Sequence, residues 1–138
     1  MTKTLSPELY RVVDANINRL KEGIRVIEDI ARYVNNDKDL ASKLKSLRHQ
    51  SNFAQLQKLL QSRDSENDVL RSSTKSEMNR ESLEGIIVAN YKRAQESSRV
   101  LEEMMKLYDA ELSENFKYIR YSLYTLEKEN LTLKSEEK

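Results

Sequence analysis

The stretch VVDANINRLKEGIRVIEDIARYV, residues 12–34, indicates the fold class of this chain. Its apolar residues recur three or four positions apart, which is the spacing of one face of an α-helix. The residues on this face are Val13, Ile17, Leu20, Ile24, Ile27, Ala31 and Val34. A polar series occupies every third position of the same stretch: Asn16, Arg19, Glu22, Arg25 and Glu28. A helix that only packs against a core does not need this series, so its side chains are candidates for binding.

Residues 86–108, IIVANYKRAQESSRVLEEMMKLY, have the same pattern. The matching polar residues, reached without a gap, are Asn90, Arg93, Glu96, Arg99 and Glu102. After a two-residue shift, the match continues with Lys45, Leu47 and Arg48 against Lys117, Ile119 and Arg120. Amphipathicity explains matching apolar positions but not matching Asn, Arg and Glu. We therefore interpret the chain as a duplicated helix pair.

The expected fold is all-α, a four-helix bundle with pseudo-twofold symmetry in one domain, residues 1–138. Ser6-Pro7-Glu8 is a typical helix start, and the helices are expected at about 7–34, 37–60, 82–108 and 110–130. Repeat one is then about 7–60 and repeat two about 82–130. Residues 61–81 lose the periodicity and are expected to form a loop, either functional or disordered. The tail, 131–138, is expected to be mobile.

Composition excludes several classes of protein. Two Gly, one Pro and no Trp among 138 residues fit a mostly helical chain. A net charge of +1 gives no electrostatic case for nucleic acid binding. There is no apolar run long enough to span a membrane and no signal peptide, so the expected location is the cytoplasm. The absence of Cys excludes disulfides and cysteine-based zinc sites.

A second stripe of residues lies beside the apolar face of each long helix. It comprises Ala15, Arg19, Glu22, Val26 and Asp29, copied as Ala89, Arg93, Glu96, Val100 and Glu103. Small and apolar residues alternating with charges predict a shielded surface, either a ligand cleft, a subunit interface or both. Arg25, Glu28, Arg99 and Glu102 are expected to project further out, where surface ion pairs are their usual fate. Asn16 and Asn90 fall within the apolar stripe, either as register-fixing core residues or as the polar floor of a pocket.

Paired Arg and Glu side chains favour anion binding, because Arg makes bidentate contacts with phosphate. The loop segment RDSENDV, residues 63–69, adds Arg63, Asp64 and Asp68, which could bind a metal–phosphate complex. From spacing alone, a solvated acidic loop is the commoner outcome for such a segment. His49, the single His, is either an ordinary half-buried helix residue or a residue with a catalytic or phosphate-contacting role. The chain has no Gly-rich phosphate loop.

Four segments together resemble a family of small helical hydroxymethylpyrimidine-phosphate kinases of thiamine biosynthesis, which occur alone or fused ahead of thiamine-phosphate synthase. They are RVVDANINRLKEGIRVIEDIARYV (11–34), LKSLRH (44–49), RDSENDV (63–69) and VANYKRAQESSRVLEE (88–103). The resemblance covers about Tyr10 to Tyr124. It implies phosphorylation of hydroxymethylpyrimidine monophosphate to the diphosphate with ATP and Mg²⁺, and no action on the free pyrimidine. The family often has Gly after the DV of the loop, where this chain has Leu70.

Residue roles follow from the spacing and the resemblance together. The expected catalytic residues are Arg19, Glu22, Arg93, Glu96, Asp64 and His49. The expected binding residues for substrate and nucleotide are Asn16, Arg25, Arg48, Arg63, Asn90 and Arg99. The expected metal ligands are Asp64, Asp68, Glu22 and Glu96. The expected partners are the pyrimidine phosphate and, beyond it, a second copy of the chain and a thiamine-phosphate synthase, with neither nucleic acid nor membrane.

Two other classes of function stay open from the residues alone. A small helical enzyme like chorismate mutase would use Arg to hold carboxylates and would need neither ATP nor Mg²⁺. A non-catalytic helical module would bind a partner or dimerise without turnover.

Overall fold

The computed structural model describes residues 4–53, 56–73 and 82–136. Within these ranges the chain is helical and contains no strand. The elements are α1 (Pro7–Asp29), the π-helical turn η1 (Ile30–Val34), α2 (Lys38–Gln50), α3 (Leu56–Ser62), α5 (Leu83–Met105) and α6 (Ala110–Glu136). In this part of the chain, no helix combines the length and apolar character needed to cross a membrane.

Side chains cap the starts of both α1 and α2, the first of them as the sequence predicts. Ser6 Oγ accepts a hydrogen bond from the Leu9 N–H at 3.3 Å, and Pro7 occupies the first turn of α1. Asp37 Oδ1 accepts from the Leu40 N–H at 3.0 Å at the start of α2. Local sequence signals therefore place both starts correctly.

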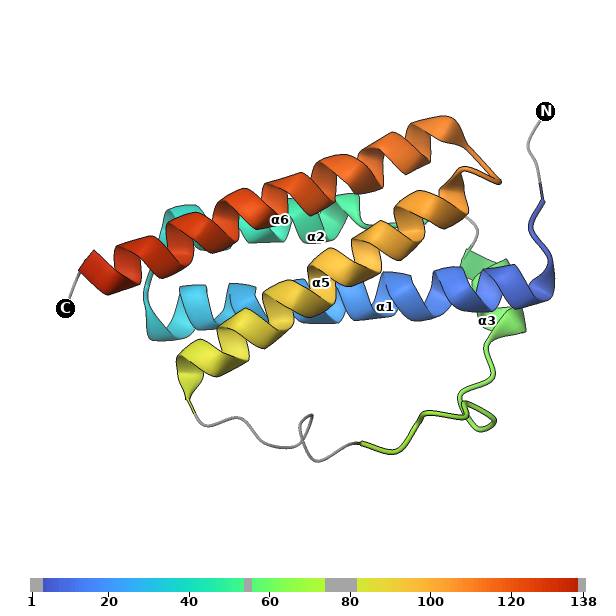
Figure 1. Cartoon of the computed structure of the whole chain (residues 1–138), viewed down its shortest axis with the longest axis horizontal. Helices are drawn as coiled ribbons and strands as arrows, with labels where there is room; N and C mark the ends of the chain where they lie inside the picture. Colours follow the sequence, from blue (N-terminus) through green and yellow to red (C-terminus); the bar gives the residue numbers. More distant parts are fainter. Residues whose placement is uncertain (1–3, 54–55, 74–81, 137–138) are drawn as a thin grey trace.

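Four long helices account for most of the packing (Figure 1). α1 and α2 run in opposite directions, as do α5 and α6. α5 packs against both α1 and α6, while α2 contacts α1 and α6, and α3 lies against α1. The two helix pairs therefore share one core.

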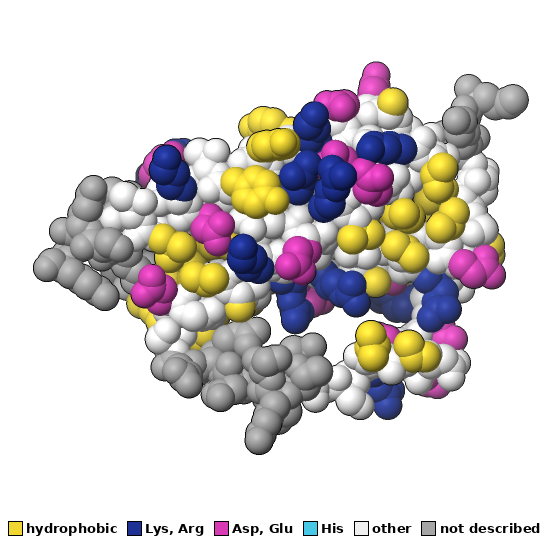
Figure 2. Space-filling view, viewed as in Figure 1, with side chains coloured by type: hydrophobic (Ala, Val, Ile, Leu, Met, Phe, Trp, Pro, Cys, Tyr) yellow, Lys and Arg dark blue, Asp and Glu magenta, His cyan; other side chains and the backbone are white. Residues whose placement is uncertain are grey.

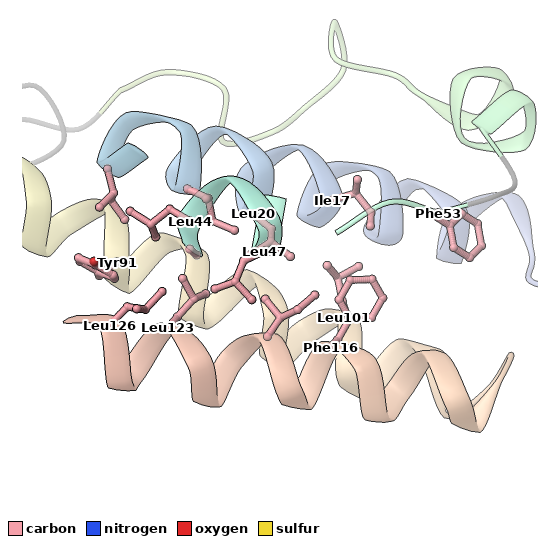
Figure 3. Close-up of a cluster of buried hydrophobic side chains, with 14 of the residues drawn as sticks. Ile17, Leu20, Leu44, Leu47, Phe53, Tyr91, Leu101, Phe116, Leu123 and Leu126 are labelled. Carbon is pink, nitrogen blue, oxygen red and sulfur yellow. The ribbon is translucent and has the colours of Figure 1, made fainter. Parts of the chain in front are cut away.

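The core confirms most of the predicted apolar face of α1. Every predicted residue from Val13 to Ala31 is buried, and side chains such as Leu44, Tyr91 and Phe116 from the other helices pack with them (Figure 3). Val34 is the exception, at 57% exposed. The π-helical turn accounts for this, because its wider turn moves the end of the segment out of register with the α-helical stripe, although Ala31 stays buried.

The predicted second helix, 37–60, is wrong in its extent, because α2 ends at Gln50 and α3 is a separate helix. Polar side chains bond the last carbonyls of α2: Ser51 Oγ donates to Leu47 O at 2.8 Å and Asn52 Nδ2 to His49 O at 2.6 Å. Phe53 then turns into the core, with its ring 5.5 Å from that of Tyr108. These local bonds compete successfully with a continued helix.

The other helix boundaries differ less from the predicted ones. α6 continues to Glu136, so residues 131–136, predicted as a tail, are helical. The predicted loop 61–81 begins within the last turn of α3, and its residues 74–81 lie outside the described residues.

Candidate functional site

A cavity of about 490 Å³ lies between the first half of α1 and the loop that follows α3. We call it the α1 cavity. Five predicted site residues line it: Asn16, Arg19, Arg63, Asp64 and Asp68. Figure 2 shows the hollow between the body of the protein and the loop, with Lys and Arg side chains along its edge. The structure therefore brings the loop motif and the start of the polar series together.

The loop is tied to α1 by Asp14 and Arg63. Arg63 Nε and Nη2 donate to the two carboxylate oxygens of Asp14, each at 2.7 Å. The Asp14 side chain is only 8% exposed and that of Arg63 is 42% exposed, so the pair reaches from the helix surface into the cavity wall. Asn18 Nδ2 donates to the same carboxylate at 3.3 Å. Hydrogen bonding to Asp14 raises the pKa of Arg63, which keeps the guanidinium charged.

The loop shape is set by its own acids. Asp64 accepts from the backbone N–H of Asn67 at 3.2 Å and from its side-chain amide at 2.9 Å, which lowers the pKa of Asp64. Asp68 Oδ1 accepts from the Leu70 N–H at 3.0 Å. Among the described residues other than Gly, only Asn36 has a positive φ, so the backbone at Leu70 does not require the Gly that the resembling family often has there.

Asn16 and Arg19 supply the binding groups on α1. Asn16 is buried, and its Nδ2 donates to Val12 O at 2.9 Å, which leaves Oδ1 as an acceptor at the cavity. Arg19 is exposed, and its guanidinium forms no hydrogen bond or ion pair with any residue that the structure describes. With Arg11 and Arg63, it gives the cavity three guanidinium groups. Four carboxylates line the same cavity, so the arrangement can hold an anion together with a cation.

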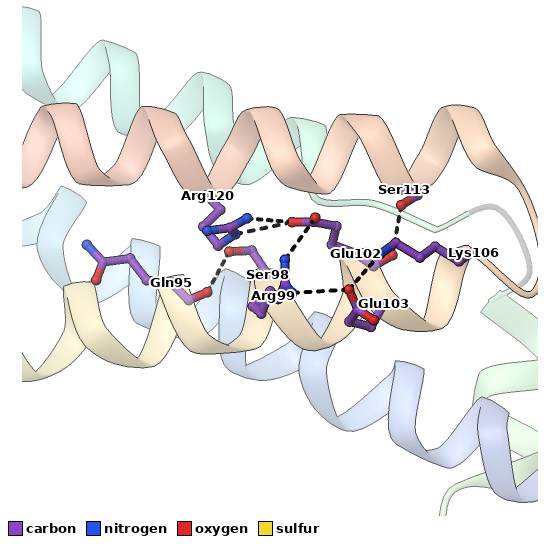
Figure 4. Close-up of polar contacts among 8 residues, drawn as sticks. All are labelled: Gln95, Ser98, Arg99, Glu102, Glu103, Lys106, Ser113 and Arg120. Carbon is purple, nitrogen blue, oxygen red and sulfur yellow. Dashed lines mark hydrogen bonds and ion pairs between the residues drawn. The ribbon is translucent and has the colours of Figure 1, made fainter.

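Two predicted surface carboxylates are instead buried, and this is a correction. Glu28 accepts from Arg48 Nε at 2.6 Å and Nη2 at 3.1 Å. Glu102 accepts from Arg120 Nη2 at 2.9 Å and from Arg99 Nη1 at 3.2 Å (Figure 4). Each Glu is neutralised by an Arg from the next helix, a partner that the sequence of one helix cannot reveal. Arg48 and Arg99, predicted to bind ligand, thus have protein partners.

Comparison with known proteins gives the family. The model of the ThiD2 family matches residues 11–129. The chain belongs to the ThiD2 family. Similar proteins include the thiamine-phosphate synthases of Thermosynechococcus vestitus (39% identical over 120 residues), Prochlorococcus marinus strain AS9601 (38% over 120) and Rhodopirellula baltica (38% over 129).

The alignments with these relatives cover most of this chain but not most of each relative. The aligned segment is 86% of this chain and 34% of the synthase from Thermosynechococcus vestitus, and 90% and 34% for that from Rhodopirellula baltica. The chain therefore spans about a third of the length of these proteins. No solved structure matches it.

Other predicted residues of this ThiD2 chain lie outside the α1 cavity. Glu22, Arg93 and Glu96 are exposed, and their side chains make no hydrogen bond or ion pair within the described structure. The charged residues Arg19, Glu22, Arg93 and Glu96 of the second stripe are thus exposed in the part of the chain that the structure describes. Asn90 repeats the bond of Asn16, with its Nδ2 donating to Ile86 O at 2.8 Å.

The remaining candidates are placed as follows. Arg25 pairs with Asp29 at 3.5 Å on the surface of α1. His49 is exposed on α2 and does not line the α1 cavity. Of the four predicted metal ligands, Asp64 and Asp68 share the cavity. Within the described ranges, no three acidic or His side chains group closely enough to form a metal site by themselves.

Asp14, Asn18 and Arg11 line the cavity but are absent from the predicted site. The sequence did hold a signal for Asp14. The matching position in the second stretch is Val88, so Asp14 is a charge where the copy is apolar. Such a difference between halves can mark a function that only one half carries.

Proposed function

We propose that this chain is an ATP-dependent kinase that converts hydroxymethylpyrimidine monophosphate to the diphosphate in thiamine biosynthesis. Membership of the ThiD2 family and the thiamine-phosphate synthase relatives support the pathway. The observation that carries the proposal is the convergence of Arg11, Arg19 and Arg63 on one cavity that Asn16 also lines. A thiamine-phosphate synthase is the partner that these relatives suggest.

The chemistry requires charge neutralisation more than proton transfer. An oxygen of the substrate phosphate forms a bond to the γ-phosphorus of ATP as the bond from that phosphorus to ADP breaks. The attacking oxygen is already anionic near pH 7, so no general base is needed. The protein must hold two anions in line, and we assign Arg19 and Arg63 to the accepting phosphate. Asn16 Oδ1 would accept from the amino group of the pyrimidine.

Mg²⁺ fits this site as a companion of the nucleotide. It is commonly held by one or two carboxylates together with substrate phosphates, and Asp64 and Asp68 are two cavity carboxylates. When bound, Mg²⁺ would neutralise charge on the ATP phosphates. We favour these two ligands over Glu22 and Glu96, which do not line the cavity.

Specificity against the free pyrimidine would follow from the arginines. A substrate without a phosphate would leave Arg19 and Arg63 facing a ligand that cannot accept their hydrogen bonds. Losing charged contacts of this kind typically costs a factor of about 100 or more in kcat/KM.

We also propose that the four long helices form a pseudo-twofold bundle from a duplicated helix pair. Two features support it. The ion pairs Glu28–Arg48 and Glu102–Arg120 occupy matching positions in the two halves. Asn16 and Asn90 also make equivalent bonds to the carbonyl four residues earlier.

The test is diphosphate formation from ATP, Mg²⁺ and hydroxymethylpyrimidine monophosphate, with the free pyrimidine in parallel. We expect product from the monophosphate only. Arg19→Ala should lower kcat/KM by about 100-fold, and Arg93→Ala, its counterpart in the second half, shows whether that half contributes. No turnover by the folded protein would overturn the proposal in favour of a binding module, and full activity of both variants would exclude the arginine roles.

A further inference from the structure

A second, smaller cavity of about 320 Å³ lies at the corner where η1 leads into α2. We call it the corner cavity. Three cations line it, Arg32, Lys38 and Lys45, together with the hydroxyl of Ser42. Its single acidic residue, Glu28, is already held by Arg48 at 2.6 and 3.1 Å. The lining therefore carries excess positive charge.

Other residues of the protein do not neutralise these three cations. The side chains of Lys38 and Lys45 make no hydrogen bond or ion pair with any residue that the structure describes. The Arg32 guanidinium stacks on the Tyr33 ring, 4.9 Å from its centroid, which holds the group in place without neutralising it. Lys38 is also the first residue of α2, where the helix dipole disfavours a positive charge. Stabilisation of the fold therefore does not explain why these three cations lie together.

The second half of the chain provides an internal comparison. Arg32 corresponds to Lys106, whose Nζ is paired with Glu103 Oε1 at 2.7 Å. Under the shift that aligns Lys45 with Lys117, Lys38 corresponds to Ala110 and Ser42 to Glu114. No π-helical turn is present there, because α5 ends at Met105 and a short turn leads into α6. At the three matching positions, Lys106 is paired, Ala110 is uncharged, and Lys117 alone is a cation without an ion-pair partner among the described residues.

We propose that the corner cavity binds a phosphate-bearing dianion or trianion. This site is separate from the α1 cavity. Along α1, the nearest lining residues of the two cavities are Arg19 and Glu28, nine residues and roughly 14 Å apart. Phosphoryl transfer needs reacting atoms about 3–3.5 Å apart, so an anion here takes no part in transfer at the α1 cavity. The inference does not depend on the kinase proposal.

The ligand chemistry follows from the lining. Arg32 can donate two parallel hydrogen bonds to phosphate oxygens, and the two lysines add point charges. Ser42 can donate a further hydrogen bond. A nucleotide, inorganic diphosphate and orthophosphate all carry this group, so each serves as a separate probe.

The experiment is a titration of the full-length protein with inorganic diphosphate, orthophosphate and ATP, followed by backbone amide NMR shifts of residues 30–45. The test variant is Arg32→Gln/Lys45→Gln. The matched control is Lys106→Gln/Lys117→Gln, which removes the same two charges from the equivalent positions. Arg19→Gln removes one cation from the α1 cavity, so that binding at the corner cavity can be told apart from binding at the α1 cavity.

We expect saturable shifts at the corner in the wild type, in the Arg19 variant and in the matched control. The test variant should bind at least about 10-fold more weakly, the usual effect of losing a charged contact to an anion. The probe that binds most tightly shows which kind of phosphate compound the corner cavity takes. Absence of saturation with every probe, or equal weakening in the matched control, would overturn the proposal, since only general charge attraction would then remain.

Discussion

At the scale of single residues, Asp14 connects α1 to the loop that lines the α1 cavity. Its carboxyl group is almost fully buried, and among the described residues its cationic partner is Arg63 in the loop. A buried carboxylate needs such compensation, because the desolvation of an unpaired charge is costly. Asp14 therefore acts on the proposed reaction through Arg63, as a positioning residue.

Asp14→Asn should loosen the loop. The amide keeps the shape of the side chain but cannot provide two charged acceptors to the Arg63 fork, so the free energy of unfolding should fall by about 1–3 kcal/mol. Hydrogen exchange of the amides at residues 65–67 should become faster, and KM for the pyrimidine phosphate should rise. Asp39→Asn is the control, because Asp39 pairs with Lys43 on the surface of α2 and is 82% exposed. Unchanged exchange in the Asp14 variant would mean that other contacts hold the loop.

The ionisation of Tyr91 leads to a prediction about the stability of the protein in alkaline solution. Burial raises the pKa of Tyr91 from its usual 10.0 to about 12, and its hydroxyl accepts from Asn130 Nδ2 at 3.2 Å. Because the folded state favours the neutral phenol, Tyr91 contributes fully to the free energy of unfolding below pH 10. This contribution is lost as pH rises from 10 to about 12. The total loss is of the order of 3 kcal/mol.

The measurement is denaturant unfolding of the wild type and Tyr91→Phe across this pH range. The Phe variant should be less stable near neutral pH by about 1 kcal/mol, because Asn130 loses its partner. The difference should shrink or reverse above pH 10, since Phe cannot ionise. A difference that stays constant with pH would show that Tyr91 is not the titrating group.

At the scale of elements, the contact between α1 and α5 depends on Gly23. A Cβ atom built at Gly23 would lie 3.1 Å from the backbone oxygen of Asn90 and 3.5 Å from the Cβ of Ala94. The backbone oxygen cannot rotate away as a side chain could. Gly23 therefore permits the close approach of the two helices, at the known cost of Gly within a helix.

Gly23→Ala should destabilise the protein by about 1 kcal/mol, although Ala is the better helix former by a similar amount. The reason is that α1 and α5 must separate by a few tenths of an ångström. Gly85→Ala is the matched control, because there the new Cβ would meet only Ser82 Oγ, at 3.3 Å, on an exposed side chain. In denaturant unfolding, the Gly85 variant should be more stable than the wild type and the Gly23 variant less stable. The opposite order would show that the helices separate freely.

At the scale of the whole molecule, the two helix pairs depend on each other. α5 packs along α1 as well as along its own partner α6, and α2 also contacts α6. The apolar faces of α1 and α5 would be exposed in a separated half. Dimerisation through the exposed stripe of Arg19 and Glu22 stays a prediction, which Glu22→Lys tests by sedimentation.

Separate fragments 1–73 and 74–138 should therefore lack stable helix. Each is too small to bury its own apolar face, and each loses the other's half of the core. Circular dichroism should show mostly unfolded fragments, with helix regained when the two are mixed. A cooperative thermal transition in either fragment alone would show that the halves are independent folding units.

The amino-acid sequence by itself determined the helical class, the buried face of α1 from Val13 to Ala31 and the capped helix starts at Ser6 and Asp37. These depend on periodicity and on side chains within four residues of each other, which one chain segment contains. Five of the predicted site residues, from Asn16 to Asp68, also lie together in the α1 cavity.

Only the tertiary structure decided which charges pair. Glu28 meets Arg48 and Glu102 meets Arg120 across neighbouring helices, and Asp14 meets Arg63 from 49 residues away. The end of α2 at Gln50 and the exposure of Val34 likewise follow from polar bonds at Ser51 and from the π-helical turn. Such outcomes depend on the free energies of contacts between distant segments, and these contacts leave no periodic trace in the sequence.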